Sequence, residues 1–127
     1  MHQDLKPQNI FVHNARFKIA DFDLSILHEG VIFGTNRQGT FPYMSLEKLT
    51  GNQYLASSKS DVYSLGVIFF KLIARHHPYV IGPIKNMEEF IKKLASNSVQ
   101  ISKSVIAKMT IEMKHLFDLI NKMITKD

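Results

Sequence analysis

Cysteine and tryptophan are both absent from the 127-residue sequence. Without cysteine the chain can form no disulfide bond and no thiolate zinc site, and it has no cysteine nucleophile. Long apolar runs are also lacking, because the longest, at residues 62–74, contains Lys71 and is shorter than the roughly 20 residues of a membrane span. The first residues show no basic segment followed by an apolar stretch, so no signal peptide is expected. These absences favour an intracellular, cytoplasmic protein without a membrane partner.

Acidic residues are in the minority, since 11 Asp and Glu stand against 16 Lys and Arg and give a net charge of +5. The basic residues are spread along the chain rather than gathered in a block, which indicates a solvated surface and no nucleic-acid partner. The 45% of apolar residues is enough to bury a core, and this length suits one domain or part of one.

The first half of the chain predicts a small hairpin followed by a long loop. Two short β-prone runs, residues 10–12 and 17–20, flank a turn at residues 13–16. Residues 23–60 then hold four of the six glycines and many Ser, Thr and Asn residues, which predicts a mostly irregular segment. Long loops inside compact domains are usually functional or disordered.

Three helices are expected in the second half. Residues 60–74 are apolar on nearly every face, which predicts a helix buried all round, with Ser60 or Asp61 as its N-cap. Residues 87–95 and 112–124 carry apolar residues at helical spacing, so each predicts an amphipathic helix. The buried faces consist of Phe90, Ile91 and Leu94 in the first and of Met113, Leu116, Phe117, Ile120 and Met123 in the second.

Residues with catalytic chemistry stand on either side of the predicted hairpin. Residues 2–9 read His-Gln-Asp-Leu-Lys-Pro-Gln-Asn, so Lys6 lies between Asp4 and Asn9. A carboxylate can orient a hydroxyl and accept its proton, a lysine can place charge near a transferring phosphoryl group, and an amide oxygen can bind Mg²⁺. Asp21 follows the second strand and should return close to Asn9, which brings a second oxygen ligand to the same corner.

Four segments occur in a fixed order: His-Gln-Asp-Leu-Lys-Pro-Gln-Asn at 2–9, Asp-Phe-Asp at 21–23, Gly-Thr-Phe-Pro-Tyr-Met-Ser-Leu-Glu at 39–47 and Asp-Val-Tyr-Ser-Leu-Gly-Val at 61–67. They resemble the catalytic loop, the Asp-Phe-Gly motif, the end of the activation segment and the start of the buried central helix of eukaryotic protein kinases. Lys6 followed by Pro7 resembles the serine/threonine branch of that family.

This resemblance implies a protein kinase-like α+β fold, of which the chain would be the C-terminal lobe: mainly α-helical, with a short β-hairpin at the N-terminus. Residues 1–127 would then form a partial kinase domain. Its parts would be a catalytic loop at 2–9, an activation segment at 21–47, a central buried helix at about 60–74 and C-terminal helices to 127.

The resemblance also assigns a reaction, the ATP-dependent transfer of a phosphoryl group to a Ser or Thr of a protein substrate. Asp4 resembles the catalytic base, and Asn9 and Asp21 resemble the two Mg²⁺ ligands in the ATP site. Lys6 resembles the lysine that helps neutralise the γ-phosphate, and Thr40 the threonine that ties the substrate loop to the catalytic Asp and Lys.

Three further residues resemble structural supports of a kinase site. His2 resembles a packed core histidine, and Asp61 the helix-cap aspartate that holds the backbone of the catalytic loop. Glu47 resembles a glutamate that pairs with an arginine beyond the last helix.

The sequence departs from the family in ways that carry their own expectations. Gln3 replaces an arginine that pairs with a phosphorylated loop, so switching by loop phosphorylation is not expected. Asp23 replaces the glycine of Asp-Phe-Gly, and Leu46 replaces the proline of Ala-Pro-Glu. No Gly-x-Gly-x-x-Gly and no Val-Ala-Ile-Lys strand occur, so the N-lobe is missing and is expected upstream. The 127 residues alone are expected to be inactive, because that lobe covers ATP.

Two other interpretations stay open. The chain could be a pseudokinase, a protein-binding module without catalysis, or it could be a gene-fragment relic without a stable product. The adjacent His76 and His77 do not predict a metal site, because neighbouring side chains on a helix point apart. A loop or helix end is expected there.

Overall fold

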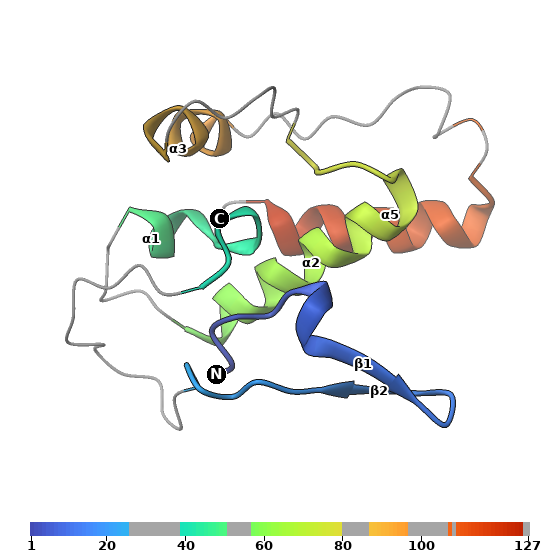
Figure 1. Ribbon diagram of the computed structural model, residues 1–127. Helices are drawn as coiled ribbons and strands as arrows, with labels where there is room; N and C mark the ends of the chain where they lie inside the picture. Colours follow the sequence, from blue (N-terminus) through green and yellow to red (C-terminus); the bar gives the residue numbers. More distant parts are fainter. Residues whose placement is uncertain (26–38, 51–56, 80–86, 97–106, 108, 126–127) are drawn as a thin grey trace.

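A computed structural model describes residues 1–25, 39–50, 57–79, 87–96, 107 and 109–125 of the chain (Figure 1). The elements, in chain order, are the 3₁₀ turn η1 (Pro7–Asn9), strands β1 (Ile10–His13) and β2 (Arg16–Ile19), the 3₁₀ turn η2 (Phe41–Tyr43), and helices α1 (Leu46–Leu49), α2 (Ser58–Ala74), α3 (Met87–Ala95) and α5 (Ile111–Ile124). These described residues are therefore mainly helical with one two-stranded sheet, as the sequence predicts.

The predicted hairpin is confirmed. β1 and β2 pair antiparallel, with Ile10 opposite Ile19 and His13 opposite Arg16. The two turn residues, Asn14 and Ala15, have φ angles of 49° and 57°, as in the tight turns whose twist matches that of paired strands. Every side chain of the hairpin is exposed except that of Ile10, which packs against the core.

The predicted irregular segment 23–60 includes residues 26–38 and 51–56, which lie outside the described residues. Its described part contains η2 and the single-turn helix α1, joined by two extended residues, Met44 and Ser45. This stretch packs on α2, since the Ser64 hydroxyl donates to the carbonyl of Tyr43 at 2.7 Å.

The predicted N-cap of the central helix is wrong. α2 begins at Ser58, and its cap is Ser57, whose hydroxyl accepts from the amide of Lys59 at 3.2 Å. Ser57 has the extended backbone that a cap requires. Ser60 and Asp61 therefore lie within the first turn, where their side chains are free to bind other parts of the chain.

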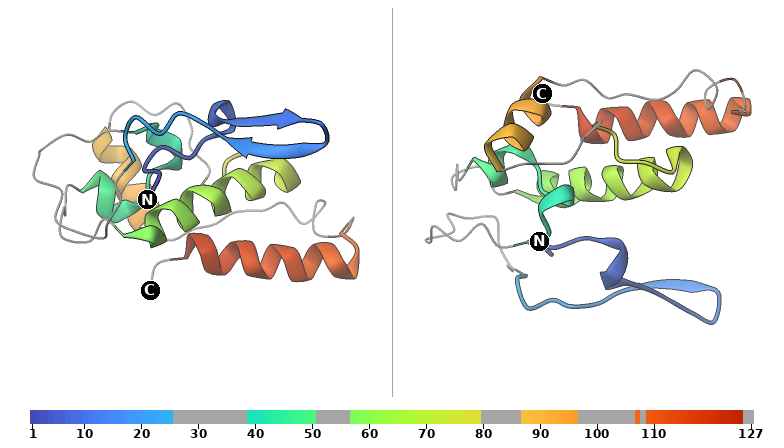
Figure 2. Two further views of the ribbon diagram at one scale, coloured as in Figure 1. Left: turned by 90° about the horizontal axis from the view of Figure 1, so that it is seen from below. Right: turned by 45° about the horizontal axis from the view of Figure 1, so that its top comes forward.

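The prediction that α2 is buried all round is also wrong. Val62 and Leu72 are 46% and 60% exposed, whereas Val67 and Phe70 are completely buried. In both views of Figure 2, α2 lies between α5 and the N-terminal segment with its hairpin, and the exposed stripe of α2 contains Val62, Phe69 and Leu72. An apolar composition alone does not show which side neighbouring elements will cover.

α5 runs alongside α2, and a glycine allows their close approach. A Cβ at Gly66 would lie only 2.7 Å from Ile124 Cγ2 and 2.8 Å from Met123 Cβ. Further along the pair, the rings of Phe70 and Phe117 lie 5.5 Å apart. Contacts at 66–124 and 70–117 show that the two helices run in opposite directions.

The predicted apolar face of α5 is only partly buried. Ile120 is fully buried and Phe117 half-buried, but Met113 and Leu116 are 37% and 44% exposed. Because the helices are antiparallel and α2 ends at Ala74, the first turns of α5 lie at or beyond the end of α2. Helical spacing predicted the face correctly, but it did not predict how far the partner helix extends.

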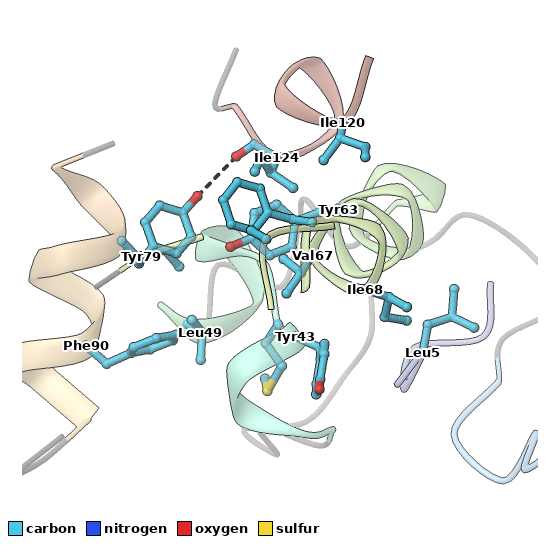
Figure 3. Packing of buried hydrophobic residues seen from close by; sticks show 14 residues of the cluster. Leu5, Tyr43, Leu49, Tyr63, Val67, Ile68, Tyr79, Phe90, Ile120 and Ile124 are labelled. Carbon is cyan, nitrogen blue, oxygen red and sulfur yellow. Dashed lines mark hydrogen bonds between the residues drawn. The ribbon is translucent and has the colours of Figure 1, made fainter. Parts of the chain in front are cut away.

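The core forms where α2, α3, α5 and the η2–α1 segment meet. Figure 3 shows Tyr63 and Val67 of α2 facing Ile120 and Ile124 of α5, with the Tyr79 hydroxyl donating to the carbonyl of Ile124 at 3.2 Å. α3 adds the predicted face, in which Phe90 and Leu94 are buried and Ile91 is half-buried. None of the helices in the described part of the chain is long and apolar enough to cross a membrane.

His77 connects the end of α2 to η2. Its Nε2–H donates to the carbonyl of Pro42 at 2.6 Å, and its Nδ1 accepts from the amide of Tyr79 at 3.4 Å. The neutral ring satisfies both bonds. Burial lowers the pKa of His77, and the charges of Lys71 and His76 lower it further, although its two backbone hydrogen bonds oppose this. No cluster of three His, Asp or Glu side chains suited to a metal occurs within the described ranges.

We expect the free energy of unfolding to rise with pH below pH 6.5, in part because of His77. Between its lowered folded-state pKa and 6.5, the unfolded chain binds more protons than the folded chain, so stability increases with pH across this window. Urea unfolding at several pH values should show that His77→Gln reduces this slope. The control, His115→Gln at an exposed position, should keep the wild-type slope. Equal slopes in the wild type and both variants would contradict the role of His77.

Candidate active site

The carboxylate of Asp61 anchors the N-terminal segment to the first turn of α2. Its Oδ2 accepts from the amide of His2 at 2.7 Å, and its Oδ1 accepts from the amide of Gln3 at 2.8 Å. Bonds to a charged acceptor are among the stronger hydrogen bonds in proteins. Two chain segments nearly 60 residues apart in sequence are thereby fixed to each other.

The His2 side chain is buried next to this anchor, and both of its ring nitrogens form hydrogen bonds. Its Nε2–H donates to the carbonyl of Ala20 at 3.0 Å, while its Nδ1 accepts from the amide of Asp4 at 3.3 Å. Its ring also contacts that of Phe22, with centroids 4.9 Å apart. The histidine thus links the segment before the hairpin to the segment after it, and both of its nitrogens are engaged.

Asp4 is the carboxylate at the centre of the site. Its Oδ1 accepts from the backbone amide of Thr40 at 2.7 Å, and its Oδ2 forms an ion pair with Lys6 Nζ at 2.6 Å. Burial raises the pKa of Asp4, but hydrogen bonds from Lys6 and Thr40 and the charge of Lys6 outweigh it, so the pKa falls below its usual value. The site therefore holds an ionised, oriented carboxylate at neutral pH.

Asn9 and Asp21 meet at the base of the hairpin. The amide of Ala20 donates to the carbonyl of Asn9 at 2.9 Å, which extends the strand pairing by one step and brings Asp21 next to Asn9. Asn9 is buried and donates from Nδ2 to the carbonyl of Asp4 at 3.0 Å, so its Oδ1 is the atom left to bind a ligand. Asp21 is exposed and has a φ of 66°, which is uncommon outside glycine.

These oxygens suit a hard cation that takes only a few of its ligands from the protein. Mg²⁺ is commonly bound through one or two carboxylates together with substrate phosphates, rather than by a full protein cage. Asp21 offers a carboxylate and Asn9 an amide oxygen, from residues that the Ala20–Asn9 backbone bond brings to the base of the hairpin. The donor set therefore suits Mg²⁺ with a phosphate ligand.

Glu47 contacts a different partner from the one implied by sequence. The resemblance implies an arginine, whereas in the described residues Glu47 Oε1 accepts from the hydroxyl of Ser60 at 3.1 Å. The Ser45 hydroxyl in turn donates to that of Ser60 at 3.2 Å. Glu47 thus links α1 to the first turn of α2, near Asp61.

Two features near Asp4 were missed by the sequence analysis. Lys48 donates from Nζ to the backbone carbonyl of Gln3. Burial lowers the pKa of Lys48, an effect that the charges of Asp4 and Asp61 partly offset. The Gln3 side chain is itself buried, with neither amide atom hydrogen-bonded to the described residues, and its φ is 73°. The only signal in the sequence for Lys48 was its position directly after Glu47 of the activation-segment motif.

Comparison with known proteins gives a consistent family assignment. A family model described as a protein kinase domain matches residues 1–127. The chain is 40% identical over 81 residues to mitogen-activated protein kinase kinase 1 of Arabidopsis thaliana, which covers 62% of this chain and 22% of that protein. It is 39% identical over 80 residues to the G2-specific protein kinase nim-1 of Neurospora crassa, with 62% and 9% covered.

A third relative extends the alignment. The chain is 41% identical over 101 residues to the calcium/calmodulin-regulated receptor-like kinase 2 of Arabidopsis thaliana, which covers 77% of this chain and 21% of that protein. The matched regions thus make up less than a quarter of the length of each of these three relatives.

We expect Asp61→Asn to lower the free energy of unfolding by about 2–4 kcal/mol, because an uncharged side chain replaces a carboxylate that accepts two backbone hydrogen bonds. Urea unfolding at pH ~7 measures the change. Asp118→Asn, at an exposed position of α5, is the control and should stay within about 0.5 kcal/mol of wild type. Similar values for the two variants would disprove the anchoring role of Asp61.

Proposed function

The chain belongs to the eukaryotic protein kinase family, and from this premise we propose that it is the C-terminal lobe of a serine/threonine kinase that transfers the γ-phosphoryl group of ATP to a protein. The observation that carries the proposal is the carboxylate of Asp4, which is held ionised between the Thr40 amide and Lys6. In this proposal residues 2–9 are the catalytic loop and residues 21–47 the activation segment.

Asp4 is proposed as the base of the reaction. Each carboxylate oxygen can accept two hydrogen bonds, so Asp4 can receive a substrate hydroxyl while keeping its bonds to Thr40 and Lys6. It orients that hydroxyl and takes its proton as the new O–P bond forms and the bond from the γ-phosphorus to the bridging oxygen breaks, which releases ADP. Thr40 fixes the carboxylate, and Lys6 places a positive charge where negative charge gathers on the transferred group.

Asn9 and Asp21 are proposed to hold Mg²⁺ with ATP. The ion, when bound, neutralises charge on the nucleotide phosphates. The chain's own part would be to offer an amide oxygen from Asn9 and a carboxylate from Asp21 at the base of the hairpin, a placement that the backbone bond between Ala20 and Asn9 supports. His2, Asp61 and Glu47 are proposed as supports, because each connects the catalytic segments to α2 or to the hairpin.

A nucleotide-covering lobe is a further requirement of this proposal. No glycine-rich phosphate loop occurs in the 127 residues. The transfer assay therefore needs the longest natural protein that contains residues 1–127. Its intact mass, measured after capture with an antibody to residues 112–127, establishes that length.

A second candidate is a protein-binding module without catalysis. The observation in its favour is the apolar surface of the hairpin and the residues after it, where five large side chains are about half-exposed or more: Phe11, Val12, Phe17, Ile19 and Phe22. Exposed apolar patches of this kind often mark interaction sites. Protein binding without any nucleotide dependence would support this candidate over the kinase.

We expect Asp4→Asn to lower phosphoryl transfer to a protein substrate by at least ~100-fold, because an amide cannot accept the hydroxyl proton. Transfer of labelled phosphate from ATP, in the longest natural protein, measures the effect. Asp118→Asn serves as the matched control and should retain full activity. Undiminished transfer by Asp4→Asn would rule out the kinase assignment of this site.

We expect Asp21→Asn to remove the Mg²⁺ dependence of nucleotide binding, because it replaces the charged ligand of the proposed metal site. The measurement is the rise in melting temperature on adding ATP with and without Mg²⁺, in the same protein. Asp118→Asn should keep the wild-type Mg²⁺-dependent rise. An unchanged Mg²⁺-dependent rise in Asp21→Asn would contradict the assignment of the ligand.

A further inference from the structure

A second lysine, Lys48, lines the same cavity as the proposed base, Asp4, and belongs to none of the motifs. It comes from α1, in the segment that follows Thr40, and its ammonium donates to the backbone carbonyl of Gln3. A small cavity is lined by Gln3, Asp4, Thr40, Lys48 and Asp61. The cation is therefore part of the wall beside the site.

Gly39 lies beside both the ammonium of Lys48 and the carboxylate of the proposed base. A Cβ at this position would lie 3.3 Å from Lys48 Nζ, 3.6 Å from Asp4 Oδ1 and 3.2 Å from the carbonyl oxygen of Gln3. The φ of Gly39 is 127°, which side-chain-bearing residues rarely adopt. The missing side chain leaves room for Lys48 beside Asp4.

The backbone of Gln3 is held from both sides. Its amide donates to Asp61 at 2.8 Å, and its carbonyl accepts from Lys48. Gln3 has a φ of 73°, a conformation that a residue with this side chain keeps only when its surroundings hold it there. The next residue is Asp4, so the direction of the Asp4 carboxylate depends on these two bonds.

We propose that Lys48 is a positioning residue. Its ammonium fixes the carbonyl of Gln3 and thereby the hydrogen bond between Asp4 and Thr40, and it does so without phosphorylation of the chain. The loop side chain at position 3 is a neutral glutamine, so the cation comes instead from the segment that contains Thr40. The same segment thus binds the catalytic loop at two points, Thr40 and Lys48.

This inference rests on the proposed function, because the direction of Asp4 matters only if Asp4 acts on a substrate. Its test needs no phosphoryl transfer, so the two can fail separately. The protein is the longest natural protein that contains residues 1–127, isotope-labelled, with the absence of phosphate checked by intact mass. The readouts are hydrogen-exchange rates of the Thr40 and Ile120 amides, measured by NMR spectroscopy.

Lys48→Met should raise the exchange rate of the Thr40 amide by at least roughly tenfold, as expected for losing a hydrogen bond from a charged donor. The Ile120 amide reports on the core and should change much less. Lys48→Arg keeps the charge and the donor and should restore Thr40 protection to within about threefold of wild type. Lys114→Met, at an exposed position of α5, should leave both amides unchanged.

An unchanged Thr40 amide in Lys48→Met would overturn the proposal. An equal rise at Thr40 and Ile120 would overturn it too, because Lys48 would then support only global stability. Should Lys48→Met not fold, the wild-type protein decides: a slowly exchanging Lys48 ammonium signal with a coupling across the hydrogen bond to the Gln3 carbonyl supports the proposal. A rapidly exchanging signal, or a Thr40 amide protected only after phosphorylation, overturns it.

Discussion

The two hydrogen bonds from the backbone of residues 2 and 3 to the Asp61 carboxylate are the contact on which the rest of the site depends. Residues 2–6 belong to no helix or strand, so no regular pairing fixes their path. Asp61 fixes it because it belongs to the first turn of a helix that is itself held in the core. A partly buried carboxylate needs donors, and two backbone amides supply them. Because α5 holds α2 in place, and Asp61 of α2 holds residues 2 and 3, the position of Asp4 also depends on the packing of α2 against α5.

Much of the fold could be predicted from sequence because its signals are local. The hairpin follows from two β-prone runs around a turn, and α3 follows from the spacing of Phe90, Ile91 and Leu94. The N-cap of α2 was missed because Ser57 and Ser60 are chemically equivalent caps, and a sequence pattern does not choose between them. The burial of α2 and α5 was overestimated because it depends on where each helix ends relative to the other.

In the candidate site, too, the contacts between residues close in sequence could be predicted and most of those between distant residues could not. Asp4, Lys6 and Asn9 lie within six residues of one another, and their spacing alone suggested that they act together. The bonds from Thr40 and Asp61 to this loop join residues 36 or more positions apart, and only the motif resemblance pointed to them. Lys48 had no such support, because no motif includes it and its contact with Gln3 spans 45 positions. For Glu47 the resemblance implied an arginine partner, whereas its partner in the described residues is Ser60.

The exposure of the hairpin affects how the chain unfolds, because only Ile10 of its two strands packs against the core. A two-stranded sheet with one side chain packed on the core has little to stabilise it, so it opens at a lower free energy than the α2–α5 pair. Asn9 and Asp21 lie at its base, which puts the proposed ligand oxygens at the edge of a unit that makes few contacts with the core. A ligand that bridges them stabilises the closed hairpin by mass action. Occupancy of the site and order of the hairpin are therefore one linked equilibrium.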